Sequence, residues 1–114
     1  MPTSSLELER TGGEGGDPLV ARLSGKLSLE TVHDFIATMR PEPANLLVLD
    51  MSGCSFLDSA GVGALVSLFV SRRNHGKKLA LAALTSQGTA VMQVSGLMKL
   101  LPLFATVDEA VAAK

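Results

Sequence analysis

The chain has 114 residues, of which 46% are hydrophobic and 4% aromatic, and its formal net charge is −1. These values predict one folded domain with an aliphatic core and exclude a disordered chain. The lack of a basic excess argues against a nucleic-acid-binding protein. Cys54 is the single cysteine, so an internal disulfide is excluded and a reducing cytoplasm is favoured. The apolar runs are too short to span a bilayer, and the N-terminal pattern does not fit a secretion signal.

The first part of the chain predicts an antiparallel hairpin followed by a helix. Leu and Glu alternate over residues 5–10, the period of a half-buried edge strand, and this edge near Leu6 would support at most a weak dimer. A glycine-rich turn at 12–18 leads to a second strand at 19–24, which Gly25 should end. We expect a helix to follow with Ser28 as its N-cap and to stop before Pro41.

The middle of the chain predicts the central strand and the longest helix. Residues 46–51 form an apolar run typical of a buried strand, and residues 52–57 read as a connection. Apolar residues then recur at helical spacing, and we expect the helix to begin with Ser59 as its N-cap and to end near residue 74, before Gly76; its apolar face comprises Val62, Leu65, Val66 and Phe69.

The remainder predicts three further elements and a terminal helix. A strand from Lys77 or Lys78 to Leu84 precedes a helix that starts at Thr85 or Ser86 and ends at Gly96. A short strand at 103–105 leads to a last helix, for which Thr106 and Glu109 form a capping box. After the hairpin, strands and helices alternate, so we expect one α/β domain over residues 1–114. Its central sheet should be mostly parallel with an N-terminal antiparallel hairpin, and helices should pack on the sheet.

Several kinds of active site find little support in the sequence. His33 and His75 are far apart and a single cysteine gives no cluster, so no metal site is expected. A helix from Ser59 to His75 would be about 24 Å long at ~1.5 Å per residue, which separates this serine from a histidine base and disfavours a hydrolase. The glycine cluster at 12–16 and the Gly61-Val62-Gly63 run match phosphate-binding and dinucleotide motifs only weakly.

Ser59 has two interpretations, a simple helix cap or a regulated hydroxyl. A phosphate at a helix N-terminus is held by free N–H groups and the helix dipole, so the helix itself should not melt. A partner docked over that helix end would instead meet a dianion. A cost of only ~3–4 kcal/mol would weaken binding several-hundred-fold, which is enough for a switch.

The residues around Ser59 resemble a known signature. Residues 48–52 (VLDMS) and 56–65 (FLDSAGVGAL) are similar to the motif of STAS domains, in particular the bacterial anti-sigma factor antagonists. The resemblance extends over nearly the whole chain, including Leu23-Ser24-Gly25, the GKKL run at 76–79 and the VSGL run at 94–97.

This resemblance implies a non-enzymatic, phosphorylation-controlled partner switch that regulates transcription. The unphosphorylated protein would bind an anti-sigma factor that is also a serine-protein kinase and so release the sigma factor. Phosphorylation of Ser59 would end that binding, and a PP2C-type phosphatase would reverse it. ATP and Mg²⁺ would belong to the kinase, so this chain needs no cofactor. The resemblance assigns partner binding to Gly25, Lys26, Asp58, Ser59, Ala60, Gly61 and Val62.

Lys26 departs from the family pattern, which has an acidic residue at that position, and it could alter the choice of partner or pair with a phosphate on Ser59. A different function within the same fold is also open. The chain would then be a stand-alone STAS subunit of a membrane transporter or lipid-transport complex, and Ser59 would be structural.

Overall fold

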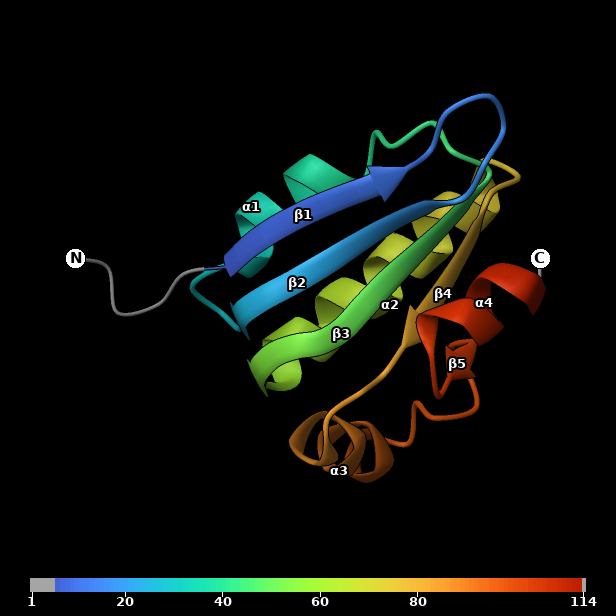
Figure 1. Ribbon diagram of the computed structural model, residues 1–114. Helices are drawn as coiled ribbons and strands as arrows, with labels where there is room; N and C mark the ends of the chain where they lie inside the picture. The colour runs from blue at the N-terminus through green and yellow to red at the C-terminus, as the bar shows by residue number, and fades with distance from the viewer. Residues whose placement is uncertain (1–5, 114) are drawn as a thin grey trace.

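The computed structural model describes residues 6–113 as one α/β domain built on a five-stranded mixed sheet (Figure 1). The strands lie in the order β1-β2-β3-β4-β5. Only β1 and β2 are antiparallel; the pairs β2–β3, β3–β4 and β4–β5 are parallel. The strand bounds are β1 Leu6–Gly12, β2 Leu19–Leu27, β3 Leu46–Leu57, β4 Lys78–Ala82 and β5 Leu103–Phe104. The fold class and the central place of β3 were therefore predicted correctly. The predicted start of the first strand at Ser5 lies outside the described residues.

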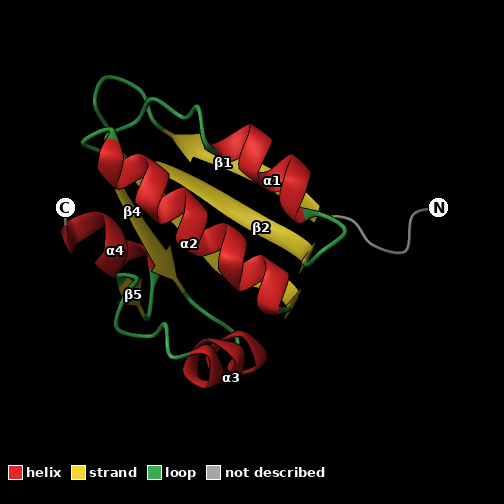
Figure 2. Ribbon diagram, turned by 180° about the vertical axis from the view of Figure 1, so that it is seen from behind, coloured by secondary structure: helices red, strands yellow, loops and turns green. Residues whose placement is uncertain are grey.

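Four helices accompany the sheet: α1 Val32–Met39, α2 Ser59–Asn74, α3 Ser86–Ser95 and α4 Val107–Ala113. Figure 2 shows α1 and α2 side by side across one face, while α4 lies on the other face near β4 and β5. The main core fills the space beneath α1 and α2, and its fully buried members include Leu23, Phe35, Leu49 and Leu65. A smaller apolar cluster beneath α4 contains Val48, Ala82 and Ala110.

The two central strands are longer than the sequence predicts. Gly25 does not end β2, and residues 52–57 are not a connection but continue β3 to Leu57. β2 and β3 stay paired over this length because the register shifts at two irregularities, between Arg22 and Ser24 and between Gly25 and Lys26. Gly25 takes a positive φ of 116° at the second shift, a conformation that glycine tolerates best. The strands therefore carry the chain further toward the start of α2.

The start of α1 also differs from the prediction, since the helix begins at Val32 and not at Ser28 or Leu29. Residues 28–31 form a turn in which the Thr31 and Val32 N–H groups donate to the Ser28 carbonyl. The Thr31 hydroxyl accepts from Ser28 N–H at 3.0 Å and donates to the Lys26 carbonyl at 2.8 Å. These hydrogen bonds fix the turn and leave Ser28 without a capping role.

The end of α2, both ends of α3 and the start of α4 agree with the sequence. At the end of α2, Gly76 has φ 73°, and its N–H donates to Arg73 while Lys77 N–H donates to Arg72, the two bonds of a Schellman cap. Thr85 and Gly96 cap the two ends of α3. Glu109 N–H donates to the Thr106 hydroxyl at 3.1 Å, as expected at the start of α4. β4, however, ends at Ala82, two residues before the predicted Leu84.

Candidate functional site

The candidate site lies where β3 ends and α2 begins. Asp58 is the N-cap of α2, with extended backbone angles, and its Oδ1 accepts from Gly61 N–H at 2.8 Å. The assignment of Ser59 as N-cap was therefore wrong; Ser59 is the first helical residue. Both side chains can cap a helix, but the Asp58 carboxylate is the one that lies three residues before Gly61, the spacing at which a cap reaches a free N–H.

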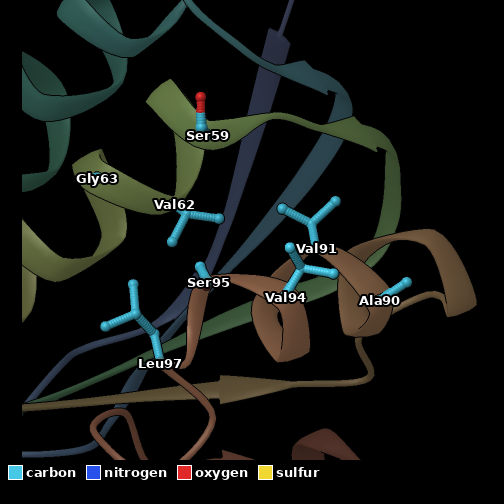
Figure 3. A pocket seen from close by; sticks show the side chains of 8 residues that line it. All are labelled: Ser59, Val62, Gly63, Ala90, Val91, Val94, Ser95 and Leu97. Carbon is cyan, nitrogen blue, oxygen red and sulfur yellow. The ribbon is translucent and has the colours of Figure 1, made fainter.

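The hydroxyl of Ser59 is accessible from solvent. The residue is exposed, and within residues 6–113 no group forms a hydrogen bond with its Oγ. Figure 3 shows this oxygen pointing away from the side chains of Val62 and Val91, out of the groove that they border. Its position in the first turn of α2 places it near helix N–H groups that lack intrahelical partners and near the positive end of the helix dipole.

Asp58 also joins this junction to the β2–α1 loop. Its Oδ2 accepts from Leu29 N–H at 3.2 Å, and its own N–H donates to the Leu27 carbonyl at 3.4 Å. The ends of the parallel strands β2 and β3 thus meet at one edge of the sheet, as the sequence suggested. A single carboxylate caps α2 and holds the neighbouring loop.

The small residues after Ser59 let the helix approach the sheet. A Cβ on Gly61 would lie 2.3 Å from the Leu27 carbonyl oxygen and 2.7 Å from Leu57 Cδ1, so only glycine fits. Val62 is 2% exposed and packs in the core. Ala60 is partly exposed on the side that faces α1. Gly61 and Val62 therefore support the site from below, and Ser59 and Ala60 are the accessible members of this first turn.

Gln87 is a site residue that the sequence analysis missed. Its side chain accepts from Leu57 N–H at 2.9 Å and donates to the Leu57 carbonyl at 2.8 Å. β4 pairs with β3 only as far as Asp50, so the edge of β3 at Leu57 has no neighbouring strand on that side. Gln87 supplies the missing partner from the first turn of α3. Nothing in the local sequence signals this contact, because it depends on where α3 packs.

Gly25 and Lys26 lie at the same end of the sheet as Ser59, but on β2. Lys26 pairs with Phe56 in the register of β2 and β3, and both residues are exposed. Lys26 alternates with the buried Leu27, which packs in the core beneath α1 and α2, so Lys26 belongs to the opposite, solvent-facing side of the sheet. Lys26 thus lies at the rim of the site, not over the start of α2.

Three exposed apolar side chains lie at this end of the domain, two of them near Ser59 and the third, Phe56, beside Lys26 on the opposite side of the sheet. Leu29 in the β2–α1 loop is 74% exposed, Phe56 at the end of β3 is 41% exposed, and Val94 on α3 is 90% exposed. A groove of about 540 Å³ separates the start of α2 from α3, and its lining is mostly apolar (Figure 3): Ser59, Val62, Gly63, Ala90, Val91, Val94, Ser95 and Leu97. Apolar groups gathered around one polar residue are typical of an interaction surface.

Within residues 6–113 no histidine forms a hydrogen bond with the Ser59 hydroxyl. His75 is at the far end of α2, where its Nδ1 lies 2.8 Å from the Ser71 carbonyl oxygen. Cys54 is buried, and this burial raises the pKa of its thiol, which disfavours the nucleophilic thiolate. Across residues 6–113 no cluster of histidine, cysteine and acidic side chains is arranged to hold a metal ion. That same region contains no helix of the length and apolarity needed to cross a membrane.

Comparison with known proteins places this geometry in a family. A family model of the STAS domain matches residues 6–110. An anti-sigma factor antagonist from Mycobacterium paratuberculosis has a similar structure, with a TM-score of 0.83, 23% identity and coverage of 98% of this chain and 96% of that one.

Two other solved structures are also similar. For the Bacillus cell fate determinant SpoIIAA in its phosphorylated form the TM-score is 0.65 at 26% identity, with 96% of this chain and 98% of that chain covered. A sulfate transporter family protein from Wolinella succinogenes has a TM-score of 0.75 at 18% identity, with 90% and 88% covered. The likenesses at 18% and 23% identity concern the fold, whereas the family model covers nearly all of this sequence. The chain belongs to the STAS domain family.

Proposed function

We propose that this protein is an anti-sigma factor antagonist whose partner binding is controlled by phosphorylation of Ser59. In its unphosphorylated form it binds an anti-sigma factor that is also a serine-protein kinase, and the bound sigma factor is released to act in transcription. The observation that carries the proposal is the exposed Ser59 hydroxyl, which has no hydrogen-bond partner in residues 6–113 and lies in the first turn of α2. The similarity to SpoIIAA, which is known in a phosphorylated form, supports it.

A phosphate on Ser59 acts mainly on the docked partner. It adds roughly −1.5 to −2 charge at neutral pH, and the free N–H groups at the start of α2 stabilise that charge. The carboxylate of Asp58 already lies next to it, so the local charge becomes strongly negative. A partner that covers this helix end would have to desolvate the dianion, and binding weakens for that reason.

The docking surface that we propose combines the accessible members of the site with the apolar side chains around it. Ser59 and Ala60 form its centre, Leu29 and Val94 flank them with exposed apolar area, and Phe56 lies beside Lys26 on the solvent-facing side of the sheet. Gly25 and Lys26 extend it to the end of β2 at the rim of the site, where a cation at Lys26 favours a partner with an acidic contact. Asp58, Gly61 and Val62 hold the centre in place from beneath.

The test is phosphorylation in an extract of the parent cells supplied with ATP and Mg²⁺, followed by mapping of the phosphate by mass spectrometry. We expect phosphate on Ser59 and none on Ser67, an exposed serine on the same helix that serves as the matched control. Ser59→Ala should remain bound to the captured anti-sigma factor, and Ser59→Asp should be released at least several-fold more readily. A PP2C-type phosphatase should remove the phosphate and restore binding.

Two outcomes would contradict the proposal. One is phosphate on other residues while Ser59 stays unmodified. The other is equal retention of the captured anti-sigma factor by Ser59→Ala and Ser59→Asp, because the charge at the start of α2 would then have no effect on binding. Circular dichroism of the two variants serves as the folding control, since both substitutions are at an exposed position.

A second candidate function is a STAS subunit of a membrane transporter or lipid-transport complex. The observation that favours it is the similarity to the sulfate transporter family protein from W. succinogenes, whose TM-score is 0.75. In this case Ser59 is structural, and affinity capture should recover a transporter protein, equally well with wild type and Ser59→Asp. Recovery of a kinase by the wild-type protein but not by Ser59→Asp favours the anti-sigma factor antagonist function.

A further inference from the structure

A second hollow lies at the other end of α2 from Ser59. Its volume is about 230 Å³, and it opens along the edge of β4. β5 is only two residues long and pairs with Leu81 and Ala82, so the first part of β4 has no neighbouring strand on this side. α2 covers one face of β4 and α4 the other (Figures 1 and 2), and together they wall the open edge. The floor is apolar and comprises Leu46, Phe69, Leu79, Ala80 and Phe104.

Three cationic side chains border this apolar floor: Arg73, Lys77 and Lys78. The guanidinium carbon of Arg73 lies 5.6 Å from the centroid of the Phe69 ring, a cation–π contact that holds the charge beside the floor. Asp17, in the β1–β2 turn, borders a neighbouring hollow that Lys78 also lines, and so offsets part of the charge of Lys78. Among the described residues, the charged side chains that line this hollow are all cationic.

The open edge also offers a backbone donor. Leu81 N–H points to the β5 side of β4, where it donates to the Pro102 carbonyl at 2.9 Å. Successive residues of a strand direct their polar groups to opposite sides, so the N–H of Leu79 lies on the same side as that of Leu81. The pairing with β5 starts only at Leu81. Leu79 is 2% exposed, so the accessible groups that can hold an anion at this edge are the cationic side chains, with the Leu79 N–H directed to the same side of β4.

We propose that this hollow, which we name the β4-edge pocket, binds an amphiphilic monocarboxylate with a linear alkyl chain. The apolar floor suits a hydrocarbon chain, and the three cations at the rim suit a carboxylate head. At roughly 30 Å³ for each water-sized group, 230 Å³ holds about seven to eight such groups, the size of a chain of six to eight carbons. A bare inorganic anion leaves the floor unfilled, and a neutral alcohol leaves the cations without a counter-charge.

The first experiment compares small ligands by calorimetry and by amide chemical-shift mapping on the ¹⁵N-labelled protein. We expect octanoate to bind with one-to-one stoichiometry, hexanoate to bind about fifteenfold more weakly at about fourfold per methylene, and acetate not to bind. Octan-1-ol, which has the same chain without the charge, should bind at least tenfold more weakly than octanoate. The largest shift changes should occur at Leu79, Ala80 and Phe104.

The second experiment uses variants at exposed or partly exposed positions. Lys77→Gln combined with Lys78→Gln should weaken octanoate binding at least tenfold, whereas Lys99→Gln, the removal of an exposed lysine outside the pocket lining, should leave it unchanged. Ala113→Phe narrows the pocket from α4 and should abolish binding while all cations remain. Ser59→Ala should bind octanoate like wild type, so this test is independent of the proposed function.

Three results would overturn the proposal. The first is a dissociation constant for octanoate above about 1 mM by both methods. The second is equal binding of octan-1-ol, or equal binding by the Lys77 and Lys78 double variant. The third is a set of shift changes at Val62 and Val91, which would place the ligand in the groove beside Ser59. Adsorption to anionic lipid vesicles without saturable octanoate binding would likewise reject the pocket and indicate a purely electrostatic surface.

Discussion

Gln87 holds both backbone polar groups of Leu57, accepting from its N–H at 2.9 Å and donating to its carbonyl at 2.8 Å. The contact ties α3 to the last residue of β3, immediately before the cap of α2. It replaces the strand that β3 lacks on this side beyond Asp50. The start of α2 is thereby anchored from α3 as well as from the β2–α1 loop, which Asp58 contacts through Leu29.

Loss of this contact should destabilise the domain. We expect Gln87→Ala to lower the free energy of unfolding by about 1–2 kcal/mol, because two part-buried hydrogen bonds are lost and water replaces them only partly. Gln93→Ala, an exposed glutamine on the same helix, is the matched control and should change little. Urea unfolding of both variants measures the difference. Equal midpoints would show that the two hydrogen bonds contribute nothing net.

The two glycines of the first turns of α2 should respond in opposite ways to the same substitution. A Cβ at Gly61 meets the Leu27 carbonyl oxygen at 2.3 Å, and we expect Gly61→Ala to cost roughly 1–3 kcal/mol of stability. A Cβ at Gly63 has no atom within 4 Å, so Gly63→Ala should stabilise the helix by about 0.5–1 kcal/mol. Denaturant midpoints with unchanged slopes would check both signs. A Gly61→Ala protein as stable as wild type would mean that α2 can lift from β2 at little cost.

The two adjacent arginines at the end of α2 should also differ in how much their replacement costs in stability. Arg72 is 2% exposed and donates to the backbone carbonyls of Lys78 at 2.8 Å, Glu42 at 3.0 Å and Ala44. Arg72→Met should cost about 3–5 kcal/mol, since buried carbonyls lose charged donors and Glu42 loses a nearby cation. Arg73 is exposed, and Arg73→Met should stay within about 0.5 kcal/mol of wild type. Thermal unfolding followed by circular dichroism compares the pair, and similar midpoints would contradict this assignment.

Stability should fall in acid in part through Glu42. Burial opposes ionisation of this carboxyl, but hydrogen bonds from Ala44 N–H and Arg10, with the charges of Arg10 and Arg72, outweigh burial and lower the pKa of Glu42 below its ordinary value of 4.5. The unfolded chain therefore binds this proton at a higher pH than the folded protein. The stabilisation is present above about pH 4.5 and is lost as pH falls through the folded pKa.

The matched variant for this pH dependence is Glu42→Gln. It should be less stable than wild type at neutral pH, because the ion pair with Arg10 is lost. Its stability should also fall less steeply below about pH 4.5, since the titrating group is absent. Urea midpoints at several pH values measure both curves. If stability falls equally steeply with decreasing pH in the two proteins, the acid sensitivity comes from other carboxyl groups.

The sequence predicted those elements whose ends carry local signals. The span of α2, the caps Thr85 and Gly96 of α3, and the Thr106 cap of α4 all follow from residues within one turn of each helix end. The order of strands and helices followed from alternating apolar patterns, and it gave the fold class. The neighbourhood of Ser59 and the β2–α1 loop followed from the rule that parallel strand ends share an edge.

The parts that the sequence did not predict depend on contacts between distant segments. The extensions of β2 to Leu27 and of β3 to Leu57 require pairing across irregular register, which apolar periodicity does not report. The choice of Asp58 over Ser59 as cap rests on one side-chain distance to Gly61. Gln87 had no signal because its partners are backbone atoms thirty positions earlier in the chain.

The start of α2 is fixed by three separate contacts: Asp58 to the Leu29 N–H, Gly61 against Leu27, and Gln87 on Leu57. These contacts come from two parts of the chain, the end of β2 with the loop after it and α3, so an outward movement of the first turn requires that contacts on both sides break. A phosphate attached at Ser59 would thus change the charge of this surface without changing the position of the helix. The backbones of the bare and modified forms should then superimpose, and a partner protein would distinguish them by charge alone, through both its association and its dissociation rate.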